Sequence, residues 1–110
     1  MKKILIALLL TVSLSAHGAE SFDDGVQAVD SGDYETAFRV FFRLAEQGNA
    51  DAQHNLGVMY ETGLGVSEND KKAVKWYRLA AEQGHAAAQY SLGVMYQTGE
   101  GVPEDVKEAL

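Results

Sequence analysis

The sequence predicts an all-α solenoid, and three observations support this fold class. Residues 49–74 align with residues 85–110 at an offset of 36 without a gap, and fifteen of the twenty-six positions are identical. Apolar residues recur at helical spacing inside each unit, and glycines stand where the helices are expected to end. Repeats of this length are typical of arrays in which each unit packs on its neighbours. We therefore expect a right-handed α-solenoid of antiparallel helix pairs, with about three repeats and the last one truncated.

The first pair of helices is expected in a divergent repeat over residues 22–48. Ser21 and Asp24 have the spacing of a capping box, which satisfies free N–H groups in the first turn of a helix. Asp33 follows a turn glycine and is placed to cap the second helix. That helix has one apolar face with members at i, i+3, i+4, i+7 and i+8. The face consists of Ala37, Val40, Phe41, Leu44 and Ala45.

Two kinds of helix alternate through repeat 49–84 and partial repeat 85–110. Four glycines close the predicted helices, because a left-handed C-terminal residue favours glycine. They are Gly48, Gly63, Gly84 and Gly99. Gly57 and Gly93 lie inside helices at a cost of about 1 kcal/mol each relative to alanine, so we expect a neighbouring backbone to pass close to them. The expected helices are 22–31, 34–47, 50–62, 70–83 and 86–98, with a sixth opening near Glu104 after Pro103.

Residues 1–19 have the organisation of a secretory signal peptide. Two lysines precede an apolar run over residues 4–14, which is short for a bilayer span, and small residues follow it. Cleavage after Gly18 or after Ser15 would place small residues at the recognition positions, and an uncleaved anchor helix is the alternative. We expect export to a periplasm or to the outside, with no membrane association after cleavage and with the solenoid domain over residues 20–110.

Charge and composition exclude several function classes. Loss of Lys2 and Lys3 with the signal peptide changes the formal charge from −7 to −9. Such an acidic domain disfavours nucleic acid and anionic lipid, because both need clustered lysine and arginine. The chain has no cysteine, so it has neither a disulfide nor a thiol nucleophile. We expect its stability to come from packing alone.

The sequence gives no support to a catalytic, cofactor or metal site. The loop Gly63-Leu64-Gly65-Val66 follows no strand and is flanked by carboxylates, so a phosphate cradle is disfavoured. His54 and His85 lie in different repeats, and surface positions near helix starts explain them better than a zinc site. No combination of serine, histidine and aspartate recurs with the spacing of a catalytic site. We expect a chain that is not an enzyme and that needs no cofactor.

Three strings of residues resemble a known repeat family. They are Ala-Gln-x-x-Leu-Gly-Val-Met-Tyr, then Thr-Gly-x-Gly-Val, and then Lys-x-Ala-Val-Lys-Trp-Tyr-Arg-Leu-Ala-Ala-Glu-Gln-Gly-His. Together they resemble the Sel-1-like repeat (SLR) family, a relative of the tetratricopeptide repeats, over about Ala37 to Leu110. The resemblance implies a protein-interaction module that acts as a scaffold or adaptor. Cysteine-rich members linked to β-lactam hydrolysis suggest a cell-envelope hydrolase as the alternative, which the absence of cysteine disfavours.

The resemblance also implies where a partner would bind. In tetratricopeptide solenoids the first helix of each repeat lines a concave groove, so a protein or peptide partner is expected there. The corresponding residues on this chain are Asp51, His54, Asn55, Val58 and Glu61 in one repeat, and Ala87, Tyr90, Ser91, Val94 and Gln97 in the next. Their mixed polar and apolar character suits a peptide better than a small metabolite.

The repeat register extends beyond Leu110. Ala109 aligns with Ala73, so the equivalents of Trp76 and Tyr77 would follow the last residue. Three interpretations remain open at this stage. The sequence is part of a longer or truncated reading frame, or its C-terminal edge pairs with another copy, or the last helix frays while giving partial cover.

Overall fold

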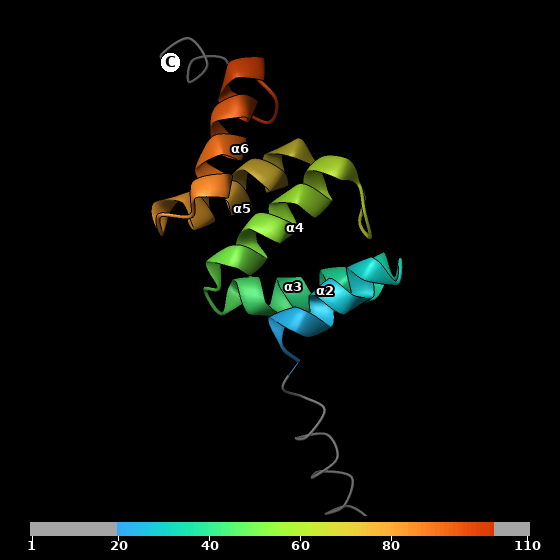
Figure 1. Cartoon of the computed structure of the whole chain (residues 1–110). Coiled ribbons are helices and arrows are strands. Elements are labelled where there is room, and N and C mark those ends of the chain that lie inside the picture. The colour runs from blue at the N-terminus through green and yellow to red at the C-terminus, as the bar shows by residue number, and fades with distance from the viewer. Residues whose placement is uncertain (1–19, 103–110) are drawn as a thin grey trace, which may run out of the picture.

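The computed structural model describes residues 20–102, and the predicted signal peptide and sixth helix lie outside this range. Figure 1 shows the helices stacked in chain order, with the first two at one end and the last at the other. They are α2 (Phe22–Asp30), α3 (Tyr34–Glu46), α4 (Ala50–Thr62), α5 (Asp70–Glu82) and α6 (Ala86–Thr98). Extensive contacts join α2 to α3, α3 to α4, α4 to α5 and α5 to α6. The chain is therefore an all-α solenoid, and the predicted helices are confirmed to within about one residue.

The helices begin and end at the predicted signals. The backbone N–H of Ser21 donates to the Asp24 carboxylate at 2.7 Å, and the Asp33 carboxylate accepts from the backbone N–H of Thr36 at 3.3 Å. Gly63 and Gly99 both have a φ of 75° at the ends of α4 and α6. The left-handed conformation costs glycine little, so these residues stop their helices cleanly.

The core consists of the predicted apolar faces of α3 and α5, closed by α4. Ala37, Phe41, Leu56 and Tyr77 are almost completely buried. Aromatic rings join the first repeat to the second, since Phe38 lies edge-on to Tyr60 at 5.5 Å between centroids. Such tilted pairs contribute about 0.5–1.5 kcal/mol beyond their buried area. The first repeat and the second therefore share one continuous core.

The glycine inside α4 has a different neighbour from the expected one. A Cβ atom built on Gly57 would lie 2.5 Å from the Tyr77 ring, so an aromatic side chain of α5 fills the space rather than a backbone. Gly25 in α2 is filled in the same way by the Phe41 ring of α3, at 2.6 Å. Nothing lies within 4 Å of the corresponding point on Gly93 in the described part of the chain. The prediction of a close backbone is therefore wrong at Gly57, where the missing side chain makes room for a ring, and within residues 20–102 no backbone lies close to Gly93 either.

The Gly-x-Gly-Val loops attach each repeat to the one before it. Gly65 has a φ of 75°, and a Cβ there would collide with the backbone carbonyl of Tyr34 at the start of α3. Gly101 has a φ of 69° and stands against the carbonyl of Asp70 at the start of α5 in the same manner. Both the backbone conformation and the close approach require glycine. The loop is thus a structural connector between repeats.

A glutamine in each repeat makes a bond that sequence reasoning did not anticipate. The Gln53 amide donates to the Ala45 carbonyl at 3.1 Å, and the Gln89 amide donates to the Ala81 carbonyl at 3.2 Å. Both acceptors lie at the C-terminal end of the preceding helix, where carbonyl groups lack partners within the helix. Gln53 is buried and also accepts from Gln83 at 2.9 Å. The repeated glutamine therefore closes the junction between one helix pair and the next.

Candidate partner-binding site

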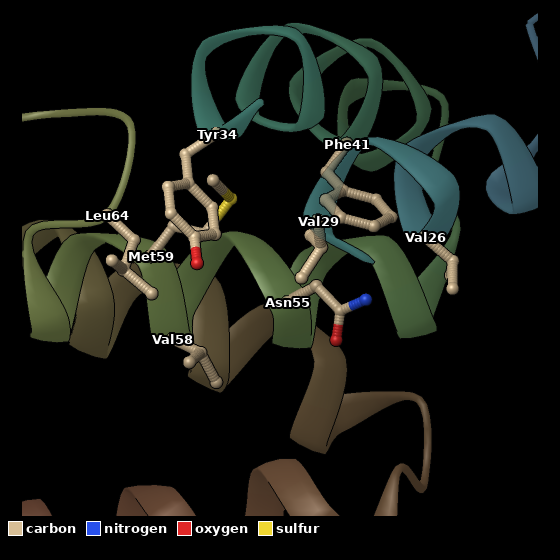
Figure 2. Close-up of a pocket in the computed structure, with 8 residues that line it drawn as sticks. All are labelled: Val26, Val29, Tyr34, Phe41, Asn55, Val58, Met59 and Leu64. Carbon is tan, nitrogen blue, oxygen red and sulfur yellow. The ribbon is translucent and has the colours of Figure 1, made fainter. Parts of the chain in front are cut away.

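An open apolar hollow lies between the first two repeats. Its volume is about 220 Å³, and Phe41 and Met59 are its most deeply buried residues. Figure 2 shows the lining side chains, which come from α2, α3, α4 and the connection that follows α4. They are Val26, Val29, Tyr34, Phe41, Asn55, Val58, Met59 and Leu64. We call this feature the α2–α4 hollow.

The local folding of the chain explains why these side chains meet. Gly32, with a φ of 78°, turns the chain sharply after α2, so that Tyr34 at the start of α3 lies near Val29 at the end of α2. The contact of Gly65 with the Tyr34 carbonyl holds the following connection against the same point. Leu64 is thereby placed at the edge of the α2–α4 hollow.

Two of the predicted site residues line this hollow. Asn55 and Val58 both project from α4 and are half-buried. Asn55 supplies an amide beside the valines of α2, while Val58 extends the apolar wall toward Leu64 (Figure 2). These are the positions of the predicted groove that face the first repeat.

Three other predicted residues make contacts with side chains of this same chain. The Tyr77 hydroxyl donates to the Glu61 carboxylate at 2.7 Å, and the Asp51 carboxylate lies 2.8 Å from Nε2 of His85. His54 packs on Tyr77 at 5.6 Å between ring centroids and stacks on His85 at 5.0 Å. Asp51, His54 and Glu61 therefore connect α4 to α5 and to the start of α6.

The two histidines differ from the expectation of separate surface positions. His85 caps α6, since its Nδ1 accepts from the backbone N–H of Ala88 at 3.1 Å. His54 is half-buried, and burial lowers its pKa from the ordinary value, with His85 adding to the effect. Burial also raises the pKa of Tyr77, and its bond to Glu61 acts in the same direction. The interpretation of His54 as a surface residue is wrong because the bend between repeats brings positions 54 and 85 together.

The remaining predicted residues lie on α6. Tyr90, Val94 and Gln97 line a second, more open hollow together with Gly93 and Tyr96. Tyr90 has 75% of its surface exposed. Ser91 is half-buried and Ala87 is exposed on the same helix. This set is therefore separate from the α2–α4 hollow, although the repeat register makes Tyr90 equivalent to His54.

Charge is divided between the two kinds of helix. The helices α2, α4 and α6 contain no lysine or arginine, and every lysine and arginine between residues 20 and 102 lies on α3 or α5. Of the three helices that line the α2–α4 hollow, α2 and α4 together carry five carboxylates. These are Asp23, Asp24, Asp30, Asp51 and Glu61. The hollow is thus set in a surface of negative charge.

The histidine and aspartate pair is not arranged for catalysis. Nε2 of His85 is engaged by Asp51, and Nδ1 accepts from a backbone N–H, so neither nitrogen is left to activate a nucleophile. Between residues 20 and 102 no three His, Cys, Asp or Glu side chains are grouped to hold a metal ion. None of the helices in that range combines the length and apolar character needed to cross a membrane.

Sequence reasoning missed most of the α2–α4 hollow. Six large hydrophobic residues are exposed in the described range, and four of them line this hollow. They are Val26, Val29, Tyr34 and Leu64. Three of these lie in the divergent first repeat, where no second copy fixes their position in the unit. The available signal was the pair of valines three residues apart on a short helix, beside the face that carries the buried residues Gly25 and Ala28.

The fold and this site define a class of helix-pair repeat proteins, and comparison with known proteins identifies the family. The Sel1 repeat pattern matches residues 50–85 and 86–110, which is more than half of the chain. The chain belongs to the Sel1 repeat family, whose members are generally protein-interaction modules.

Relatives and solved structures agree with this assignment. A putative sel1-like repeat-containing protein of Acanthamoeba polyphaga mimivirus is 54% identical over 37 residues. The match covers 34% of this chain and 7% of the length of the viral protein. The DAP3-binding cell death enhancer 1 of Rattus norvegicus is 44% identical over 50 residues. The match covers 46% of this chain and 10% of the length of the rat protein. The chain thus spans a tenth or less of these relatives.

Two crystal structures share the fold. A Sel1 repeat protein from Oxalobacter formigenes superposes with a TM-score of 0.63 at 49% identity. The match covers 68% of this chain and 31% of the Oxalobacter chain. A protective antigen of uropathogenic Escherichia coli strains, which displays an SLR fold, superposes with a TM-score of 0.71 at 39% identity. That match covers 74% of this chain and 18% of the antigen.

Proposed function

We propose that this chain is an exported, non-catalytic interaction module that serves as a scaffold or adaptor. We propose further that it binds a protein partner at the α2–α4 hollow. The observation that supports the binding surface is the convergence of four exposed apolar side chains on one hollow. Exposed apolar groups scattered singly need no explanation, whereas a contiguous group rimmed by polar residues is typical of an interaction site. Membership of a family of interaction modules supports the same conclusion.

In-cell photo-crosslinking tests the binding surface. The variants Val29→p-benzoylphenylalanine and Leu79→p-benzoylphenylalanine are matched, because each residue is 37% exposed and only Val29 lines the hollow. We expect a discrete crosslinked product from position 29 that is absent from position 79. The same products from both positions, or none from position 29, would contradict the proposal.

Export rests on the organisation of residues 1–19, with two lysines before a short apolar run. A fusion of alkaline phosphatase to Leu110 tests it, since this enzyme is active only after export. We expect phosphatase activity with the full chain and its loss when residues 2–19 are deleted. Equal activity of the two fusions would reject export by this segment.

A further inference from the structure

We infer that the α2–α4 hollow is an anchor site for one bulky apolar side chain of a partner's peptide segment, and that lysine or arginine residues flank this side chain. The inference rests on the proposed function and names the chemistry of the partner. It draws on the size of the hollow, the character of its lining, and the charge around it.

The size of the hollow favours a single side chain. Sites for drug-sized molecules usually occupy about 300–1,000 Å³ and enclose most of the ligand, whereas this hollow measures about 220 Å³ and is open to solvent. Protein interfaces commonly concentrate their binding energy where one large side chain enters such a depression. The α2–α4 hollow is therefore matched to an anchor residue rather than to a metabolite.

The lining of the hollow favours an apolar anchor. Phe41 and Met59 are nearly completely buried and form an apolar base, while Val26, Val29 and Leu64 remain partly exposed around it. An entering aromatic or large aliphatic group would cover surface that is now in contact with water. Removal of this apolar surface from water favours binding.

The charge around the hollow identifies the flanking residues. Asp30 directly follows Val29, and Asp51 and Glu61 lie along α4 on either side of Asn55 and Val58, where they also contact His85 and the Tyr77 hydroxyl. No lysine or arginine is present on α2 or α4, and the two arginines of α3 lie 3.8 Å and 3.1 Å from the Glu20 carboxylate. A segment with lysine or arginine beside its anchor would meet charges of opposite sign, whereas an acidic segment would be repelled.

The hollow is also independent of the C-terminal end of the described structure. Its lining comes from α2, α3, α4 and the connection after α4. The second hollow, on α6, includes Gly93, which is the equivalent of the Gly57 that the Tyr77 ring covers.

A set of synthetic peptides tests the inference directly. The probe is a dansyl-labelled peptide of the sequence Gly-Lys-Lys-Phe-Lys-Lys-Gly. Its binding is followed by fluorescence anisotropy and by methyl NMR of the chain without residues 1–19, the predicted signal peptide. Two control peptides replace the phenylalanine by glycine, or all four lysines by glutamate. We expect shifts confined to methyl groups of Val26, Val29, Val58, Met59 and Leu64.

The expected ranking separates the two parts of the inference. The glycine control should bind about tenfold or more weakly, since it loses a buried aromatic group. The glutamate control should show no binding, and affinity for the lysine peptide should fall with added salt. Binding of all three peptides alike, or absence of binding by the lysine peptide, would overturn the inference.

Protein variants locate the binding event. Val29→Asp should abolish binding of the lysine peptide, while Leu79→Asp, equally exposed at 37%, should leave it unchanged. Equal binding by both variants would place the peptide elsewhere and overturn the inference. If the hollow methyl groups shift with protein concentration alone, a second copy is the occupant, and the inference is again wrong. A crosslinked partner at position 29 would still support the proposed function in either case.

Discussion

The helices α4 and α6 carry nearly the same sequence but are packed to different extents. In α4 the residues Leu56, Gly57 and Tyr60 are buried, whereas their equivalents on α6, Leu92, Gly93 and Tyr96, are half-buried or exposed. The helix α4 makes extensive contacts with both α3 and α5, while among the helices of residues 20–102 the extensive contacts of α6 are with α5. In this solenoid the neighbouring helices, rather than the residue itself, decide which residues are buried.

The largest contrast is expected at the repeated leucine. Leu56 is fully buried, so Leu56→Ala should lower the free energy of unfolding by about 2–5 kcal/mol. Leu92 is half-buried, and Leu92→Ala should lower it by about half as much or less. Urea denaturation followed by circular dichroism measures both values. Equal losses would show that α6 is as tightly packed as α4.

The repeated glutamine should give the next largest contrast. Gln53→Ala leaves the Ala45 carbonyl and the Gln83 side chain without their buried partner. We expect a loss of about 1–3 kcal/mol, because unsatisfied buried groups are costly. Gln89→Ala removes an exposed bond and should cost less than about 1 kcal/mol. Thermal unfolding of both variants measures the two losses. A loss for Gln53→Ala no larger than that for Gln89→Ala would contradict the role of Gln53 at the junction.

Replacing the repeated glycine by alanine should change the stability in opposite directions at its two positions. In Gly57→Ala the new methyl group meets the Tyr77 ring, which is buried and bonded to Glu61 and so has little room to move. We expect a net loss of about 1–2 kcal/mol, because overpacking outweighs the gain in helix propensity. Gly93→Ala meets no atom within 4 Å in the described structure and should gain up to about 1 kcal/mol. The unfolding midpoints of the two variants measure these changes. Shifts of the same sign in Gly57→Ala and Gly93→Ala would refute the account of Gly57.

The smallest expected effect concerns the histidine that α6 lacks. His54 faces His85, Asp51 and the Tyr77 ring, and its pKa lies below the ordinary value of 6.5. Below that value the unfolded chain binds more protons than the folded chain, so stability decreases as the pH falls toward the lowered pKa. His54→Tyr, which copies Tyr90, should reduce this decrease. Melting temperatures measured between pH 7.5 and pH 5 test the difference, and identical profiles would contradict it.

The sequence predicted the helices well because their signals are local. Caps such as Asp33, the glycines at helix ends and the spacing of apolar residues all act within a few positions along the chain. The stacking of His54 on His85 and the filling of Gly57 by Tyr77 depend on how helices from separate segments meet. No pattern within one segment carries that information.

The candidate site was predicted only where the repeat register applied. Asn55 and Val58 are among the positions that the family resemblance assigns to a groove, and both line the α2–α4 hollow. Val26, Val29 and Tyr34 lie in the divergent repeat, so their register could not be read from a second copy. Their convergence on one hollow results from the turn at Gly32 and from the loop at Gly65, which reaches back to Tyr34.

Residue-resolved amide hydrogen exchange tests the comparison of α4 and α6 most directly. Amides in well-packed helices exchange only through large opening events, whereas those at less packed ends exchange through local ones. We predict that the amides of Leu56 and Gly57 exchange at least about 100-fold more slowly than those of Leu92 and Gly93. Equal exchange rates at these matched positions would contradict the claim that neighbouring helices, and not the repeated sequence, determine how firmly each residue is held.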